Sequence, residues 1–166
     1  MDPFSLFHQE VLDRLTSDIT VLAAVPEENF IDLQANENPK NKALGEADYP
    51  YVWLQPTEAE YNLKGTSTHS VISQRYALQL STNRSRSYNE LSDYADRYVL
   101  PVRWAIARVI FDMVGDLTLT DDDGNSYKYI VDLENSNEAI KNNKGTRGWY
   151  TELFIVATLY HPRSSM

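Results

Sequence analysis

The amino-acid sequence predicts an α+β domain, with a mainly antiparallel sheet of about four to six strands covered by an N-terminal helix and one long helix. Three observations lead to this prediction. Two stretches repeat apolar residues every three to four positions, which is typical of helices. Segments that alternate between apolar and polar residues occur in pairs separated by polar loops, as in hairpins. The closing stretch is apolar on both faces, which is typical of a strand in the middle of a sheet.

The composition limits the classes of protein to which the chain can belong. Its 166 residues are enough for one domain with one core. The chain has no cysteine, so disulfides and thiolate zinc ligands are excluded, and we expect an intracellular protein. We expect neither a cleaved signal peptide nor a membrane-spanning segment. A formal net charge of −9 disfavours tight binding of nucleic acid.

The first helix is predicted from Pro3 to Leu15. Asp2 is a good N-terminal capping residue, and proline is tolerated at the first helical position. His8 lies beside the apolar stripe, where a lone histidine is far more often a packing residue than a ligand. The apolar stretch from Ile19 to Val25 fits either a helix or a strand. The stripe of the first helix consists of Phe4, Phe7, Val11 and Leu15.

A short strand, a long loop and a hairpin are predicted next. Phe30 to Leu33 is the short strand, and the polar segment from Gln34 to Asp48 has no regular periodicity. That segment is either a mobile insertion or a contact arm. Tyr51 to Tyr61 and Val71 to Thr82 are rich in aromatic and β-branched residues, so we expect a hairpin with one buried face. Its connection, Asn62 to Thr68, is too long for a tight turn and is expected to project.

The long helix is predicted to begin at Ser87 and to end near Val114. Ser87 and Glu90 form a capping box. Pro101 removes a backbone donor inside this helix, so we expect a kink or break near Val99 to Leu100. The apolar stripe that faces the sheet consists of Leu91, Tyr94, Ala95, Tyr98, Val102, Ile106, Val109, Ile110 and Met113.

The C-terminal half of this helix has a second apolar face, roughly opposite the first. A helix that is apolar on two sides needs two partners, and one of them is the sheet. The other is either the first helix of this chain or a neighbouring subunit. The candidate subunit interface is Leu100, Trp104, Ala107 and Phe111.

A second hairpin and a final strand complete the prediction. Leu117 to Thr120 and Ser126 to Leu133 flank a turn formed by Asp121 to Asn125. The strand from Trp149 to Tyr160 is apolar on both faces and is expected in the middle of the sheet. The predicted inner face of the second hairpin consists of Tyr127, Tyr129, Val131 and Leu133.

No reactive constellation is recognisable, and we predict no catalytic, cofactor-binding or metal-ligating residue. The run from Asp121 to Asp123 suggests calcium, but the first and twelfth positions of such a loop would be leucine and isoleucine. Glu58 and Glu60 face the same way on a strand, where a solvated edge is the better interpretation. No nucleophile elbow, zinc-protease helix or phosphate-binding loop is present. The sequence therefore does not predict an enzyme.

Four parts of the chain resemble a known family. They are Ser17 to Leu22 after the first helix, Tyr49 to Leu54 at the start of the first long strand, the hairpin that leads to the long helix, and Arg147 to Tyr150 before the last strand. Together with the order of the elements, they resemble the tail-terminator or tail-completion proteins of long-tailed bacteriophages. The insertion from Gln34 to Asp48 and the proline at position 101 depart from that pattern.

The resemblance implies a homo-oligomeric ring, commonly hexameric, at the head-proximal end of a phage tail tube. Such a ring stops polymerisation of the tail-tube protein and provides the surface to which the head connector (the neck) docks. It is a structural part of the virion, assembled in the host cytoplasm, without a cofactor or a membrane, and DNA passes through it without specific binding. The negative charge of this chain agrees with that role. The candidate contact loops around the ring are represented by Asn62, Lys64, Gly65, Lys141, Lys144 and Arg147.

Two alternatives remain open at this point. A head-completion or neck adaptor protein of the same virion region would use the same kind of acidic ring. A small ligand-binding or enzymatic α+β domain would instead use the tyrosine-rich face of the sheet as a pocket. The mass in solution separates this second alternative from the assembly proteins. A ligand-binding domain is expected to stay small at low concentration, whereas an assembly protein is expected to form a ring or a concentration-dependent oligomer.

Overall fold

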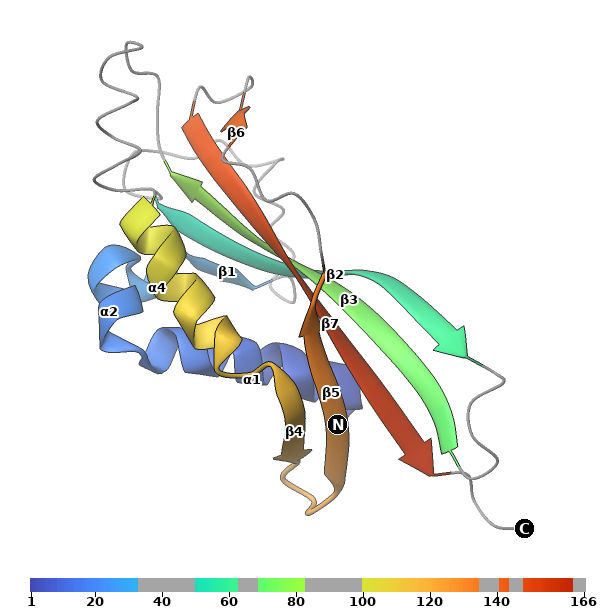
Figure 1. Cartoon of the computed structure of the whole chain (residues 1–166). Helices are drawn as coiled ribbons and strands as arrows, with labels where there is room; N and C mark the ends of the chain where they lie inside the picture. The colour runs from blue at the N-terminus through green and yellow to red at the C-terminus, as the bar shows by residue number, and fades with distance from the viewer. Residues whose placement is uncertain (33–49, 63–68, 83–99, 135–140, 144–147, 163–166) are drawn as a thin grey trace.

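The computed structural model describes residues 1–32, 50–62, 69–82, 100–134, 141–143 and 148–162 (Figure 1). The helices are α1 (Pro3–Ser17), α2 (Ile19–Ala24) and α4 (Leu100–Phe111), with a 3-10 turn at Glu27–Asn29. The strands are β1 (Phe30–Asp32), β2 (Tyr51–Asn62), β3 (His69–Thr82), β4 (Gly115–Thr120), β5 (Ser126–Leu133), β6 (Lys141–Asn143) and β7 (Gly148–Pro162).

The predicted α+β class is confirmed. The described strands form one sheet in the order β1-β2-β3-β7-β5-β4, and β6 pairs with β7 off this path. All pairs are antiparallel except β1 with β2. The five long strands agree with the predicted number, and the three-residue strands β1 and β6 extend the sheet. Among the described residues, none of the helices has the length and apolar character needed to cross a lipid bilayer.

The two N-terminal helices begin at aspartate caps. Asp2 Oδ2 accepts a hydrogen bond of 2.9 Å from the backbone N–H of Ser5 at the start of α1. Asp18 Oδ1 accepts one of 3.0 Å from the N–H of Val21, and this cap makes the ambiguous stretch after α1 a helix. The stripe predicted for α1 is confirmed, because Phe7, Val11 and Leu15 are completely buried and Phe4 packs against the core.

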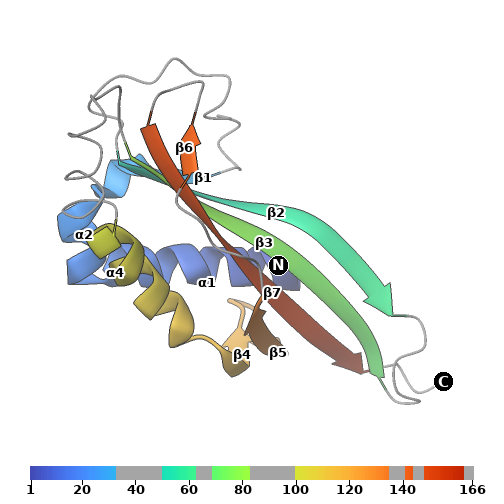
Figure 2. The ribbon, with the colours of Figure 1, turned by 45° about the horizontal axis from the view of Figure 1, so that its top comes forward.

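The sheet twists around the helices, which pack on its inner face (Figures 1 and 2). The C-terminal ends of β2 and β7 and the N-terminal end of β3 extend beyond the helices in both views. β7 pairs with β3 on one side and with β5 and β6 on the other, so its predicted place in the middle of the sheet is confirmed. Its inner residues Ile155, Ala157 and Leu159 lie in the core.

The first hairpin differs from its prediction at one end. Leu78 and Leu80 of β3 are buried on the inner face, as expected. On the opposite face, however, Tyr51, Trp53 and Gln79 are also buried, so the prediction of a single buried face is wrong here. The consecutive apolar residues at the start of β2 are typical of a strand covered on both sides.

Part of the predicted long helix lies outside the described residues. This part includes the capping box at Ser87 and Glu90 and the kink expected at Val99. In the described part α4 begins at Leu100, and Pro101 is in its first turn. A proline is tolerated there, because the first N–H groups of a helix have no partner within it.

Two buried tyrosines attach the first turn of α1 to the sheet. Tyr76 Oη of β3 donates a hydrogen bond of 2.8 Å to the carbonyl of Phe4, and Tyr129 Oη of β5 donates one of 2.6 Å to Pro3. The ring of Phe7 lies between them, with centroid distances of 5.2 Å and 5.6 Å. Burial raises the pKa of both hydroxyl groups, which keeps them protonated as donors.

Replacing Tyr129 by phenylalanine is expected to lower the free energy of unfolding by about 1 kcal/mol, because the change deletes one donor and leaves the buried ring in place. Urea denaturation followed by circular dichroism measures the loss. The control is Tyr61→Phe, since Tyr61 is 67% exposed. Equal stability of the two variants would contradict an anchoring role for the Tyr129 hydroxyl.

Candidate subunit interface

Helix α4 has one buried face and one exposed face, and its second apolar stripe lies on the exposed side. The inner stripe packs into the core against the sheet. On the other side Trp104 is 61% exposed and Phe111 is 45% exposed. Helices α1 and α2 contact α4 without covering these two rings. The buried residues of the inner stripe are Val102, Ala105, Ile106, Val109, Ile110 and Met113.

The two exposed aromatic rings contact each other. Trp104 and Phe111 are seven positions apart, which places them two turns apart on the same side of the helix. Their ring centroids are 6.1 Å apart in an edge-to-face arrangement with an interplanar angle of 64°. Single exposed apolar side chains are ordinary on protein surfaces, but joined ones mark interaction sites. The pair therefore forms a small apolar surface that the described chain leaves open to solvent.

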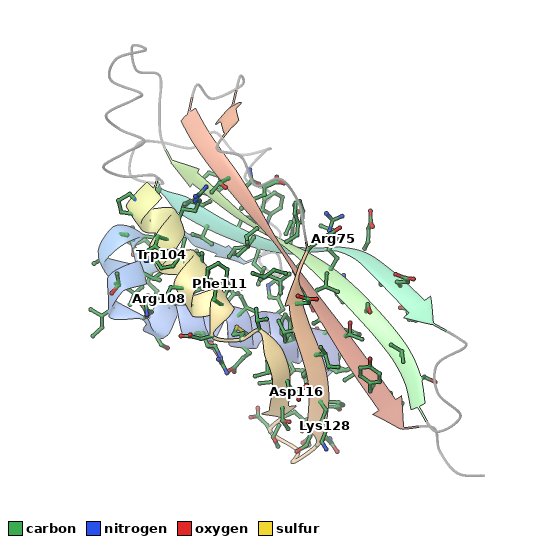
Figure 3. The ribbon with its side chains drawn as sticks, in the orientation of Figure 1. Arg75, Trp104, Arg108, Phe111, Asp116 and Lys128 are labelled. Atoms are coloured by element: carbon green, nitrogen blue, oxygen red, sulfur yellow. The ribbon has the colours of Figure 1, made fainter. Side chains whose placement is uncertain are left out.

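Arg108 lies between Trp104 and Phe111 along the sequence of α4, and its side chain is next to the contacting rings (Figure 3). Its Nη2 donates a hydrogen bond of 2.8 Å to Asp18 Oδ2, and its side chain remains 43% exposed. Asp18 thus caps α2 and also fixes the arginine. The backbone N–H of Val21 and then the Arg108 guanidinium hold the pKa of Asp18 below its usual value. We call Trp104, Arg108 and Phe111 the α4 ridge.

The lowered pKa of Asp18 makes a pH-dependent contribution to stability. This contribution is present above the usual carboxyl pKa, near 3.8, and is lost as the pH falls through the lower folded-state value. Asp18→Asn keeps a capping side chain but removes the charge. We expect this variant to melt at a lower temperature than the wild type at pH 7, with a difference that shrinks in acid.

Thermal melts over a series of pH values test this expectation. Asp112→Asn is the matched control, since Asp112 is an exposed carboxylate just after α4. A difference in melting temperature that stays constant from neutral to acidic pH would contradict the assigned role of the Asp18 charge.

The other predicted interface residues have less exposure or lie outside the description. Ala107 is half-buried and lines a narrow crevice of about 20 Å³ between α4 and strands β3 and β7. Leu100 is the first residue of α4, but its side chain is not among those described. Asn62 ends β2 and Lys141 begins β6, also without described side chains. The remaining candidate loop residues, Lys64, Gly65, Lys144 and Arg147, lie outside the described residues.

The hairpin of β4 and β5 carries a surface that the sequence analysis missed. Alternation along β5 points Tyr129 and Val131 into the core and Ile130 outward, where it is 43% exposed. Asp116 of β4 pairs with Ile130 in the register of the sheet. A groove of about 390 Å³ opens on this outer face. It is lined by Asp116, Leu117, Thr118, Lys128, Tyr129, Ile130 and Tyr160, and we call it the hairpin groove.

The apolar residues of this outer face differ in how they are covered. Farther from the hairpin turn, Phe154 of β7 lies under the guanidinium of Arg75, which is 4.1 Å from its ring centroid. The guanidinium is held there by Glu134, with 2.5 Å between Nε and Oε2. Ile130 and Tyr160, in contrast, remain 43% and 39% exposed. In the described part of this face, the apolar residues of the groove therefore remain open to solvent.

The turn of the second hairpin is confirmed. Asp121 Oδ1 accepts hydrogen bonds from the backbone N–H groups of Asp123 and Asn125, at 3.0 Å and 2.9 Å. These bonds, first that of Asn125, lower the pKa of Asp121 despite its burial. Gly124 has a φ of 84°, which a side chain would disfavour. In the described part of the chain, no group of three His, Cys, Asp or Glu residues could hold a metal ion.

A second cavity lies at the start of α1. It has a volume of about 230 Å³ and is lined by Asp2, Phe4, Ser5, His8, Pro56, Gln74 and Tyr76. The buried ring of His8 lies 6.0 Å from that of Tyr76, as expected for a packing residue.

Comparison of the chain with models of protein families and with curated protein sequences gives no match.

Proposed function

We propose that the chain is a structural subunit of a long-tailed bacteriophage, and that it forms a ring that terminates the tail tube and joins it to the head connector. The order of the described elements supports this proposal, because it follows the order on which the resemblance rests. Ser17 to Leu22 form the junction of α1 and α2, and Tyr51 to Leu54 begin β2. The first hairpin is followed along the chain by α4, and β7 is the last strand.

The exposed α4 ridge carries the proposal. Tryptophan and arginine are enriched among the residues that dominate protein–protein binding energies. Here Trp104 and Phe111 present two contacting apolar rings next to an arginine that an ion pair already orders. Ordering the arginine in advance lowers the entropy that its side chain loses on binding. A surface built in this way supports an assembly role better than a catalytic one.

The charge of the chain is the second supporting feature. A net charge of −9 repels the phosphates of DNA. A ring of such subunits favours passage of DNA over binding to it. Among the cavities of the described residues, those near α1 and on the hairpin are both open to solvent, and a ligand-binding domain that used either of them would take a small molecule there.

Electron microscopy of the purified chain tests the proposal. We expect particles of one kind, closed rings with a central opening, that attach to the end of tubes when tail-tube subunits are added. Open filaments would show heterologous contacts that do not close. Particles of monomer size alone, both with and without tail-tube subunits, would contradict the proposal, and so would rings that never cap a tube.

A further inference from the structure

The chain exposes two surfaces of opposite character on separate elements. The α4 ridge comes from α4, and Asp116 and Lys128 of the hairpin groove come from β4 and β5 (Figure 3). The ridge projects two aromatic rings, whereas the groove is a hollow with Ile130 and Tyr160 in its lining. One surface has the shape of a knob and the other that of a recess.

The two surfaces lie on elements of different charge. Helix α4 carries Arg103 and Arg108 and no acidic residue, although the chain as a whole is acidic. The segment 115–134, which forms the hairpin and its flank, carries six carboxylates and one lysine. In the groove itself Asp116 lies beside the exposed Ile130, and Lys128 is also in the lining. On the ridge, Arg108 is paired with Asp18. An apolar centre with a charged rim is the usual anatomy of an interface between proteins.

We propose that the α4 ridge of one copy docks in the hairpin groove of the next copy. This contact is heterologous, since it joins two different surfaces, and repetition around an axis closes a ring. The inference rests on the proposed function and names the second half of its interface. Trp104 and Phe111 pack against Ile130 and Tyr160 of the neighbouring copy, and Arg108 faces the carboxylates around the groove.

Charge disfavours one symmetric alternative. Two hairpins packed against each other would bring their carboxylates together, since the segment 115–134 carries six carboxylates and one lysine. Like charges across an interface cost free energy and suppress such a pairing. Two α4 ridges would meet without this repulsion, because each Arg108 is already paired with Asp18, and the variants of Ile130 distinguish that arrangement from ridge against groove. In the head-to-tail orientation Arg108 approaches an acidic hairpin instead of a second arginine.

Two complementary variants test the contact. Trp104→Asp destroys the ridge but keeps the groove, and Ile130→Asp destroys the groove but keeps the ridge. Each variant alone is expected to associate at least about 30-fold more weakly than the wild type, as at other binding hot spots. An equal mixture is expected to form a heterodimer and nothing larger, because the ridge of Ile130→Asp fits the groove of Trp104→Asp. The dimer cannot grow, because its two unused surfaces are the substituted ridge of Trp104→Asp and the substituted groove of Ile130→Asp.

Native mass spectrometry distinguishes the heterodimer from homodimers, since the two variants differ in mass. Tyr61→Asp is the matched control and is expected to assemble like the wild type. Tyr61 is 67% exposed, and the register of the sheet places it in the same row as Tyr129, on the face opposite Ile130. Circular dichroism establishes that each variant is folded. Ile130→Thr, which keeps a β-branched residue in the strand, provides a second test of the groove and should weaken association less than Ile130→Asp.

The possible failures are distinguishable. Suppose that the wild type forms rings and that both Ile130→Asp and Ile130→Thr are folded. If these two variants then assemble as well as the wild type does, the groove is not part of the interface. If each variant alone is monomeric and their mixture is also monomeric, ridge and groove are not partners. Either result overturns this inference and leaves the proposed ring standing. A wild-type chain that remains monomeric overturns both.

Discussion

Replacing Phe7 by alanine is expected to lower the free energy of unfolding by about 3–5 kcal/mol, the usual cost of emptying a buried phenylalanine site. Phe7 is completely buried and lies between the rings of Tyr76 and Tyr129. Both tyrosines are hydrogen-bonded to the first turn of α1, so they cannot easily move into the cavity. The change therefore removes packing at the point where the first helix meets β3 and β5.

Urea denaturation measures this loss, and the Trp104→Asp background keeps dissociation of an oligomer from contributing to the apparent stability. Phe111→Ala is the control, because Phe111 is 45% exposed and its loss should change the stability of the monomer little. A loss below about 1 kcal/mol for Phe7→Ala would mean that α1 is not held as described.

The second large effect is expected from Trp104→Asp on association. Removing a central aromatic residue and adding a charge should cost about 2–4 kcal/mol, or roughly 30- to 1000-fold in the dissociation constant. The monomer should keep its fold within about 0.5 kcal/mol, since Trp104 is 61% exposed and lies on a helix surface.

Sedimentation equilibrium of Trp104→Asp beside the control Tyr61→Asp measures the dissociation constants, and circular dichroism monitors the fold. Loss of the fold together with association would show that this face belongs to the core of the monomer. Association equal to that of the control would show that the α4 ridge contacts nothing.

Local patterns were sufficient to predict most of the elements. The turn at Asp121 to Asn125 is specified by side chains that satisfy their own backbone, and the stripe of α1 by its helical spacing. The stretch after Ser17 was ambiguous because six apolar residues fit both periodicities, and the Asp18 cap decides for α2. Whether such a short stretch forms a helix or a strand depends on a single capping hydrogen bond, which the spacing of apolar residues does not reveal.

The hairpin groove could not be predicted, because it depends on the register of strands far apart in the sequence. Tyr160 adjoins Ile130 only because Leu159 of β7 pairs with Tyr129 of β5. One signal was present: Ile130 is an isoleucine between Lys128 and Asp132, at a position where alternation requires a polar residue. The second apolar face of α4 was easier to predict, because it lies within one helix, although its periodicity left open what covers it.

The mass of the wild-type chain in solution tests most directly whether the α4 ridge joins copies of this protein. Sedimentation velocity over a wide range of concentrations is expected to show a monomer that converts to one discrete oligomer as the concentration rises. A single species with the monomer mass of 19.1 kDa at every concentration would contradict the account.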